Sequence, residues 1–136
     1  MRSVQLFPAM RPQRLTSVLD EIGERAGSEW FGIADGRLEV KVEEHESMED
    51  LLRSLQDEGS WSATEIDALQ KAGGGELGGS WVEVRVSGRV DGQEEMRSLV
   101  LRLLAEGGYG FDDYSDRAWS LEEIRDGLPT GETFRA

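Results

Sequence analysis

The stretch FDDYSDRAW, residues 111–119, holds the densest set of polar side chains in the chain. Asp112, Asp113 and Asp116 offer the oxygen ligands that Mg²⁺ and Ca²⁺ prefer. Their spacing does not match an EF-hand loop, which needs further carboxylates, a central glycine and a closing glutamate. We therefore expect no metal and no other cofactor. The segment is interpreted as a polar loop whose acids cap turns or pair with Arg117.

The residues that catalysis commonly uses are scarce. His45 is the single histidine, and it lies in EEHES, residues 43–47. There it could act as a general base that activates Ser47 as a nucleophile. No G-x-S-x-G motif occurs, and the absence of cysteine excludes a thiolate metal site and a cysteine nucleophile. We therefore expect His45 at the surface and no enzymatic activity.

A repeated pattern, Trp-Ser-x-x-Glu-Ile, occurs at residues 61–66 and 119–124. In both copies the serine and glutamate have the spacing of a helix capping box, and the flanking tryptophan and isoleucine have that of a hydrophobic staple. The repeat is therefore predicted to start two short helices, and a functional alternative stays open, because large aromatic residues beside loop acids can anchor an interface.

Charge indicates the class of partner. The chain has 15 basic and 28 acidic side chains, a formal charge of -13. Such a surface repels nucleic acids and anionic membranes and attracts basic proteins. No stretch is apolar for long enough to span a membrane. The absence of cysteine fits a cytoplasmic location, and the preference for arginine over lysine fits a GC-rich bacterial source.

The apolar spacing predicts the elements that position these residues. A helix opens at Pro12, carries an apolar stripe to Ala26 and ends at Gly27, and Asp35-Gly36 predicts a hairpin. We expect strands over 3–8, 38–43, 80–90 and 109–111, and further helices over 47–58, 62–72, 94–104 and 121–126.

These elements predict a single domain, residues 1–136, of the α+β class. Strands with one polar face need cover on one side only. We therefore expect two layers: an antiparallel or mixed sheet of about four or five strands, with two long amphipathic helices on one face and short extra helices.

The segment DDYSDRAWSLEEI, residues 112–124, resembles the tail of small acidic immunity proteins of bacterial toxin systems, in which an acidic loop and a tryptophan precede a short helix. The resemblance implies a protein-binding inhibitor that neutralises a cognate toxin, commonly a nuclease, with its acids in place of the substrate phosphates. The expected partner-binding residues are Tyr109, Asp112, Asp113, Tyr114, Asp116 and Trp119.

Two alternatives remain open at this point. One is a small enzymatic or ligand-binding α+β domain, with a pocket lined by Trp30, Phe31, Trp81 and Phe111, although these residues suit a core equally well. The other is a domain that self-associates through an exposed strand edge.

Overall fold

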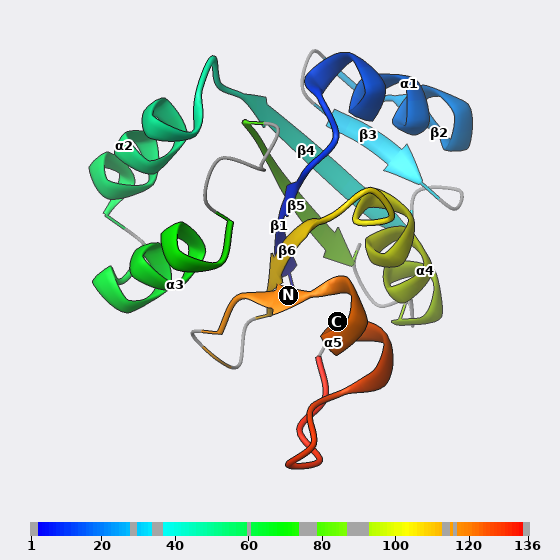
Figure 1. Cartoon of the computed structure of the whole chain (residues 1–136). Helices are drawn as coiled ribbons and strands as arrows, with labels where there is room; N and C mark the ends of the chain where they lie inside the picture. Colours follow the sequence, from blue (N-terminus) through cyan, green and yellow to red (C-terminus); the bar gives the residue numbers. More distant parts are fainter. Residues whose placement is uncertain are drawn as a thin grey trace.

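Seven strands form one antiparallel sheet in the order β2-β3-β4-β5-β1-β6-β7 (Figure 1). The computed structural model describes residues 3–27, 30–33, 37–59, 61–73, 79–86, 93–112, 115 and 117–134. The strands are β1 (Ser3–Pro8), β2 (Gly23–Arg25), β3 (Trp30–Ile33), β4 (Leu38–Glu44), β5 (Ser80–Val86), β6 (Gly108–Phe111) and β7 (Trp119–Ser120).

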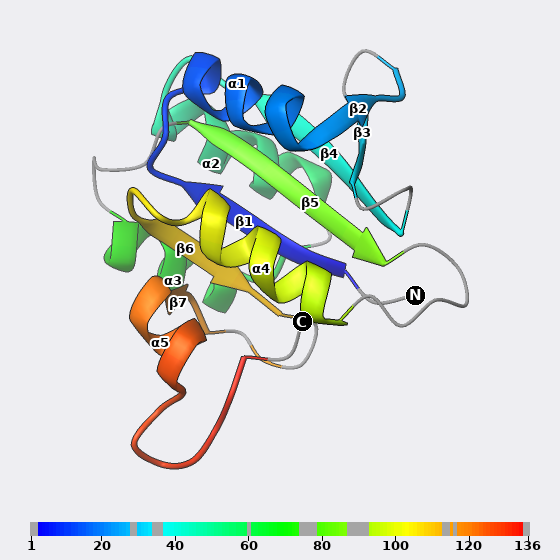
Figure 2. The same ribbon diagram turned by 90° about the vertical axis from the view of Figure 1, so that its right-hand side faces the viewer.

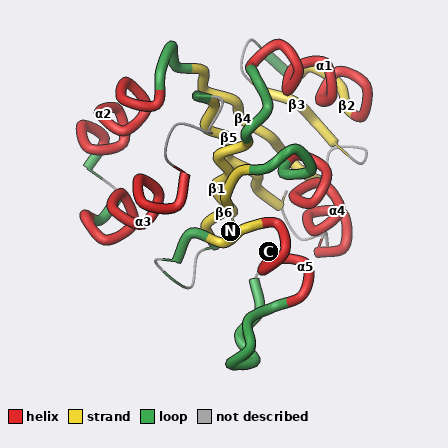
Figure 3. Tube along the Cα trace, viewed as in Figure 1, coloured by secondary structure: helices red, strands yellow, loops and turns green. Residues whose placement is uncertain are grey.

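Helices cover both faces of this sheet (Figure 2). Helices α1 (Pro12–Ile22), α4 (Gln93–Leu103) and α5 (Leu121–Asp126) lie on one face. Helices α2 (Met48–Glu58) and α3 (Ala63–Gly73) lie on the other face. Figure 3 shows the same arrangement by type, with helices on either side of the strands.

The larger core lies beneath α1, α4 and α5. Because side chains alternate along a strand, every second residue of β4 and β5 enters this core. These residues are Leu38, Val40, Val42, Val82, Val84 and Val86. The apolar stripes of α1 and α4 pack on them, and burial of each large side chain contributes about 1.5–3 kcal/mol.

The smaller core joins α2 and α3 to the opposite face and is built around aromatic rings. The ring centroid of Trp61 lies 5.5 Å from that of Phe7, 5.3 Å from Phe111 and 5.9 Å from Trp81. All three contacts are edge-on, a geometry that adds about 0.5–1.5 kcal/mol per pair beyond burial. Both helices add leucine or isoleucine side chains: Leu51, Leu55, Ile66 and Leu69.

The predicted two-layer arrangement is wrong. The α+β class holds, but the sheet has seven strands rather than four or five, and helices cover both faces rather than one. The physical reason is that β1 and β6 carry apolar rings on the second face, Phe7 and Phe111, and this apolar patch needs cover of its own. The extra strands β2 and β7 are short edge strands.

The first helix ends earlier than predicted, at Ile22 rather than Gly27. Gly23 takes an extended conformation and starts the edge strand β2, which pairs with β3. A Cβ at Gly23 would lie 2.2 Å from Ile33 Cδ1 and 2.6 Å from the carbonyl oxygen of Gly32. A glycine is therefore needed for β2 to approach β3 this closely.

Both capping boxes are confirmed. Ser62 and Glu65 exchange backbone-to-side-chain hydrogen bonds of 3.0 and 3.1 Å, and Ser120 and Glu123 exchange theirs at 3.0 and 3.3 Å. Burial raises the pKa of Glu123, but hydrogen bonds from Ser120 and Arg117 outweigh it and hold that pKa below its ordinary value. The ionised carboxylate thus stabilises the fold above its unfolded pKa, and this contribution is lost as pH falls through the lowered value.

The strands on either side of the predicted hairpin, β3 and β4, pair antiparallel. The turn residues Asp35 and Gly36 lie outside the described residues. The glycine-rich connector from residue 74 to 78 also lies outside them.

Replacing Gly23 with alanine should destabilise the protein by about 1–3 kcal/mol, because the new methyl group meets a backbone oxygen that cannot rotate away. Urea denaturation measures the change. Gly32→Ala on the neighbouring strand is the matched control, since its Cβ would have no neighbour closer than 3.9 Å. Equal losses in the two variants would contradict the close approach of β2 to β3.

Replacing Ser120 with alanine removes the side-chain acceptor at the start of α5 and should cost about 1 kcal/mol. Thermal unfolding provides the measurement. Ser98→Ala on the exposed side of α4 is the control, because that serine caps no helix. A Ser120→Ala protein as stable as the control would show that the capping box contributes nothing.

Candidate functional site

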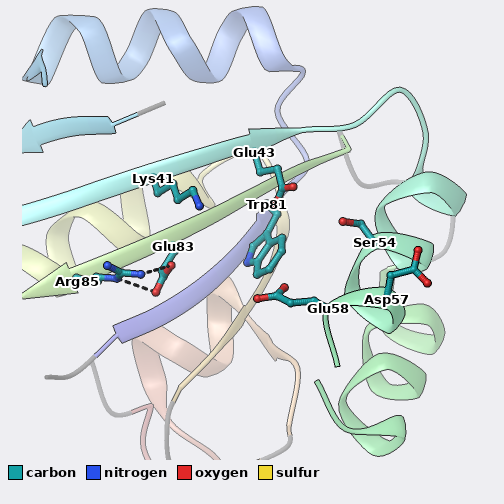
Figure 4. Close-up of a pocket in the computed structure, with 8 residues that line it drawn as sticks. All are labelled: Lys41, Glu43, Ser54, Asp57, Glu58, Trp81, Glu83 and Arg85. Atoms are coloured by element: carbon teal, nitrogen blue, oxygen red, sulfur yellow. Dashed lines mark hydrogen bonds and ion pairs between the residues drawn. The ribbon is translucent and has the colours of Figure 1, made fainter. Parts of the chain in front are cut away.

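A cleft of about 470 Å³ opens between α2 and the uncovered part of β4 and β5 (Figure 4). Helices α2 and α3 contact the sheet through the aromatic cluster, and the polar part of this sheet face is left open beside them. The cleft is lined by Lys41, Glu43, Ser54, Asp57, Glu58, Trp81, Glu83 and Arg85.

Strand alternation places the floor of the cleft. The valines of β4 and β5 point into the larger core, so the residues between them point the other way. The register sets Lys41 opposite Glu83, and Glu43 opposite Trp81. Two neighbouring strands thus present a lysine, two glutamates and a tryptophan on one small surface.

Arg85 and Glu83 form a rigid ion pair on this floor. Arg85 Nε lies 2.9 Å from Glu83 Oε2, and Nη2 lies 3.0 Å from Oε1, a bidentate arrangement. This hydrogen bonding raises the pKa of Arg85. Desolvation lowers that pKa, but the negative charges of Glu83 and Glu39 raise it further, so the net shift is upward. The guanidinium carbon also lies 5.1 Å from the centre of the Trp30 ring, within cation–π range.

The Trp81 side chain is held at a fixed angle beside the floor. Its Nε1 donates a hydrogen bond of 2.6 Å to Gln5 Oε1 on β1, and its ring contacts Trp61 edge-on. The residue remains half-buried and lines the cleft. A ring fixed at two points loses little conformational entropy when a ligand packs on it.

Helix α2 supplies the wall. Ser54, Asp57 and Glu58 are three and four residues apart, so they share one side of the helix. In the described part of the chain neither Asp57 nor Glu58 forms an ion pair, and the last turn of α2 contains no basic residue. Acids at a helix C-terminus face the negative end of the helix dipole, at a cost of about 0.3–1 kcal/mol each at exposed positions.

His45 is not at the surface, contrary to the prediction. Its side chain is only 14% exposed, and its Nε2 lies 3.7 Å from Glu43 Oε1 with no hydrogen-bond partner among the described residues. The backbone amide of His45 donates to the Gly79 carbonyl and continues the β4–β5 ladder. Ser47 accepts a hydrogen bond from the Asp50 amide as the N-cap of α2.

The described members of the predicted partner-binding set, Tyr109, Asp112 and Trp119, do not line the cleft. Asp112 is 7% exposed and accepts two bonds of 3.0 Å from Ser115, one from the amide and one from the hydroxyl. Trp119 is 2% exposed, packs edge-on against Phe134, and donates to Ser115 Oγ. The remaining members of the predicted set are Tyr109, which is half-buried on β6, and Asp113, Tyr114 and Asp116, which lie outside the described residues.

Sequence reasoning did not find the cleft, although parts of its signal are visible in the sequence. Lys41 and Glu43 alternate with Leu38, Val40 and Val42 in the sequence, a pattern typical of the polar face of a strand. The pairing of β4 with β5, and the position of α2 over that face, depend on contacts between distant segments. Only these contacts bring Trp81 and Glu58 together.

A second groove, of about 450 Å³, lies between α1 and α4 over Ile33. Two of its rim residues are already in ion pairs: Glu95 with Arg37 and Arg102 with Glu21. Among the described residues no cluster of three or more His, Asp or Glu could hold a metal ion. None of the described helices has the length and apolar character needed to cross a bilayer.

Comparison with protein families, with curated proteins and with solved structures gives no match for this chain. Function is therefore inferred from the cleft itself and from the charge of the surface around it.

Replacing Gln5 with leucine should remove the acceptor that fixes Trp81 and cost about 0.5–1.5 kcal/mol in the free energy of unfolding. A double-mutant cycle with Trp81→Phe isolates this hydrogen bond, because the phenylalanine variant lacks the donor. If Gln5→Leu costs the same in the wild type and in Trp81→Phe, the hydrogen bond does not hold the ring.

Proposed function

We propose that the chain is a protein-binding domain that holds a basic segment of a partner protein in the cleft between α2, β4 and β5. The observation that carries the proposal is the arrangement of uncompensated acids around a fixed aromatic ring. Figure 4 shows Trp81 between Glu43 and Glu58, with Ser54 on the wall.

The cleft suits a cationic side chain. It is lined by two basic and four acidic residues, which leaves a formal charge of -2. A lysine or arginine of the partner could pack on the Trp81 ring, an interaction worth about 0.5–2 kcal/mol depending on desolvation. It would also relieve the unfavourable position of Asp57 and Glu58 at the end of α2.

The charge of the whole domain supports the same partner class. A formal charge of -13 accelerates association with a basic protein and opposes the approach of polyanions. Aromatic residues and arginine dominate the energetic centres of protein interfaces, and Trp81 is a half-buried tryptophan at such a position.

The inhibitor role follows as part of the proposal. A domain that covers a basic cleft of a nuclease-like toxin would block access of the nucleic acid, as expected for an immunity protein. The acidic segment 112–116 is proposed as a second contact region for the same partner. A small-molecule site is the less favoured alternative, because such sites are mostly apolar and Trp81 is the only aromatic side chain among the described residues that line this cleft.

Binding of a short arginine-containing peptide, measured by calorimetry at low and high salt, tests the proposal. Reversing two acids on the cleft wall, Asp57→Lys with Glu58→Lys, should weaken binding about tenfold, because the wall then repels the peptide. The new lysines lie favourably at a helix C-terminus, so the fold should be retained.

The matched control reverses two exposed acids away from the cleft, Glu24→Lys with Glu132→Lys, and changes the net charge by the same amount. This variant should bind the peptide nearly as well as the wild type. Equal weakening in both variants would mean non-specific attraction and would contradict the cleft as the site. A third variant, Asp113→Lys with Asp116→Lys, tests the second contact region.

A further inference from the structure

Lys41 is a cation on the cleft floor whose cross-strand carboxylate is already engaged. Glu83, its cross-strand partner, is held by Nε and Nη2 of Arg85. Glu43, two residues along β4, forms no ion pair with Lys41 in the described part of the chain. Within the described ranges Lys41 takes part in no ion pair, yet its side chain is half-buried.

Lys41 and a second cation, Arg85, lie over the same ring. The Nζ of Lys41 is 6.0 Å from the centre of the Trp30 ring, and the guanidinium carbon of Arg85 is 5.1 Å from it. An ammonium group carries three donors and no acceptor. A half-buried ammonium without an ion pair is stabilised when an anion binds, since the anion supplies both charge and acceptors.

The cleft therefore has two ends of opposite character. Glu43 and Glu58 lie on either side of Trp81 at one end, with Asp57 farther along the α2 wall, and Lys41 and Arg85 lie toward the other end (Figure 4). Both of these cations lie over the Trp30 ring. Glu83, which lies directly opposite Lys41, is paired with Arg85. A ligand that fills the whole cleft meets a cation-binding end and an anion-binding end.

We propose that the segment bound in the cleft is zwitterionic: a basic side chain packs on Trp81, and a carboxylate binds to Lys41. This inference rests on the proposed function and specifies its partner. Trp81 is level with Glu43, and Lys41 is two strand residues away, a separation of about 7 Å.

The separation selects the kind of ligand. The α-ammonium and α-carboxylate of a free amino acid share one carbon and are too close together to reach both ends, and the proposed function already assigns the cleft to a segment of a partner protein. In an extended chain, residues i and i+2 point to the same side and are about 7 Å apart. The matching partner is therefore an extended segment in which a basic and an acidic residue are separated by one residue.

Four short acetylated glycine–serine peptides test this, with affinities for the full chain measured by calorimetry. The first carries arginine and glutamate separated by one residue, and the second has glutamine in place of that glutamate. In the third, arginine and glutamate are adjacent. The fourth keeps the glutamate and lacks the arginine. The first should bind about fivefold more tightly than the second.

The chain contains only two lysines, which provide a matched pair of variants. In Lys41→Gln the first and second peptides should bind equally. In Lys71→Gln the fivefold preference should persist, because Lys71 lies on α3, is 78% exposed and pairs with Asp67. Lys41→Arg, which keeps the charge, should restore the preference, and thermal unfolding checks that each variant is folded.

The outcomes separate the two proposals. If no peptide binds, the proposed function itself is overturned. If the first and second peptides bind the wild type equally, the zwitterionic partner is overturned while the basic-segment proposal stands. If the adjacent pair binds as tightly as the spaced pair, the extended segment is wrong. Binding of the glutamate-only peptide at full affinity would reveal an anion site and overturn both proposals.

Discussion

The docking of α2 and α3 on one end of a sheet face is the contact on which the cleft depends. It is made by aromatic rings: Trp61 lies edge-on to Phe7, Phe111 and Trp81. Rings from β1, β5 and β6 thus attach both helices to the sheet, and the leucines of α2 complete the contact. Because the apolar patch stops at these rings, the neighbouring polar surface stays open and becomes the floor of the cleft.

The β4–β5 register is the second requirement. It sets Lys41 opposite Glu83 and Glu43 opposite Trp81, and it buries the valines of both strands on the other face. A shift by one residue would exchange the two sets and place charges in the larger core. The burial of the valines therefore fixes the geometry of the charged surface, and the charged residues themselves need not contribute stability.

Local signals predicted much of this structure. The serine–glutamate spacing identified the starts of α3 and α5, and apolar periodicity identified four of the five helices to within a residue or two. The end of α1 was not predicted, because the apolar stripe continues to Ala26 while Gly23 joins the sheet through a distant contact with Gly32 and Ile33. Helix spacing alone cannot reveal such a contact.

The second helical layer was missed for a related reason. Val4 and Leu6 alternate on the face of β1 that enters the larger core, but Phe7 lies on the other face, where it packs against Phe111 and Trp61. Most of the predicted contact residues lie in one acidic segment, residues 112–119. Trp119, however, is used in the core, and Asp112 is used in a turn with Ser115. Net charge is a property of the whole chain, and it favours a class of partner without pointing to one surface.

The position of β1 inside the sheet has a consequence for how the protein is made. Leu6 pairs with Val82 on one side and with Gly110 on the other, and both partners come from the later part of the chain. During synthesis the first strand therefore leaves the ribosome long before it can be paired, and the sheet closes only once β6 has emerged. Until then Leu6 and Phe7 are exposed on an unpaired strand, a state in which binding by a chaperone would protect the nascent chain from aggregation.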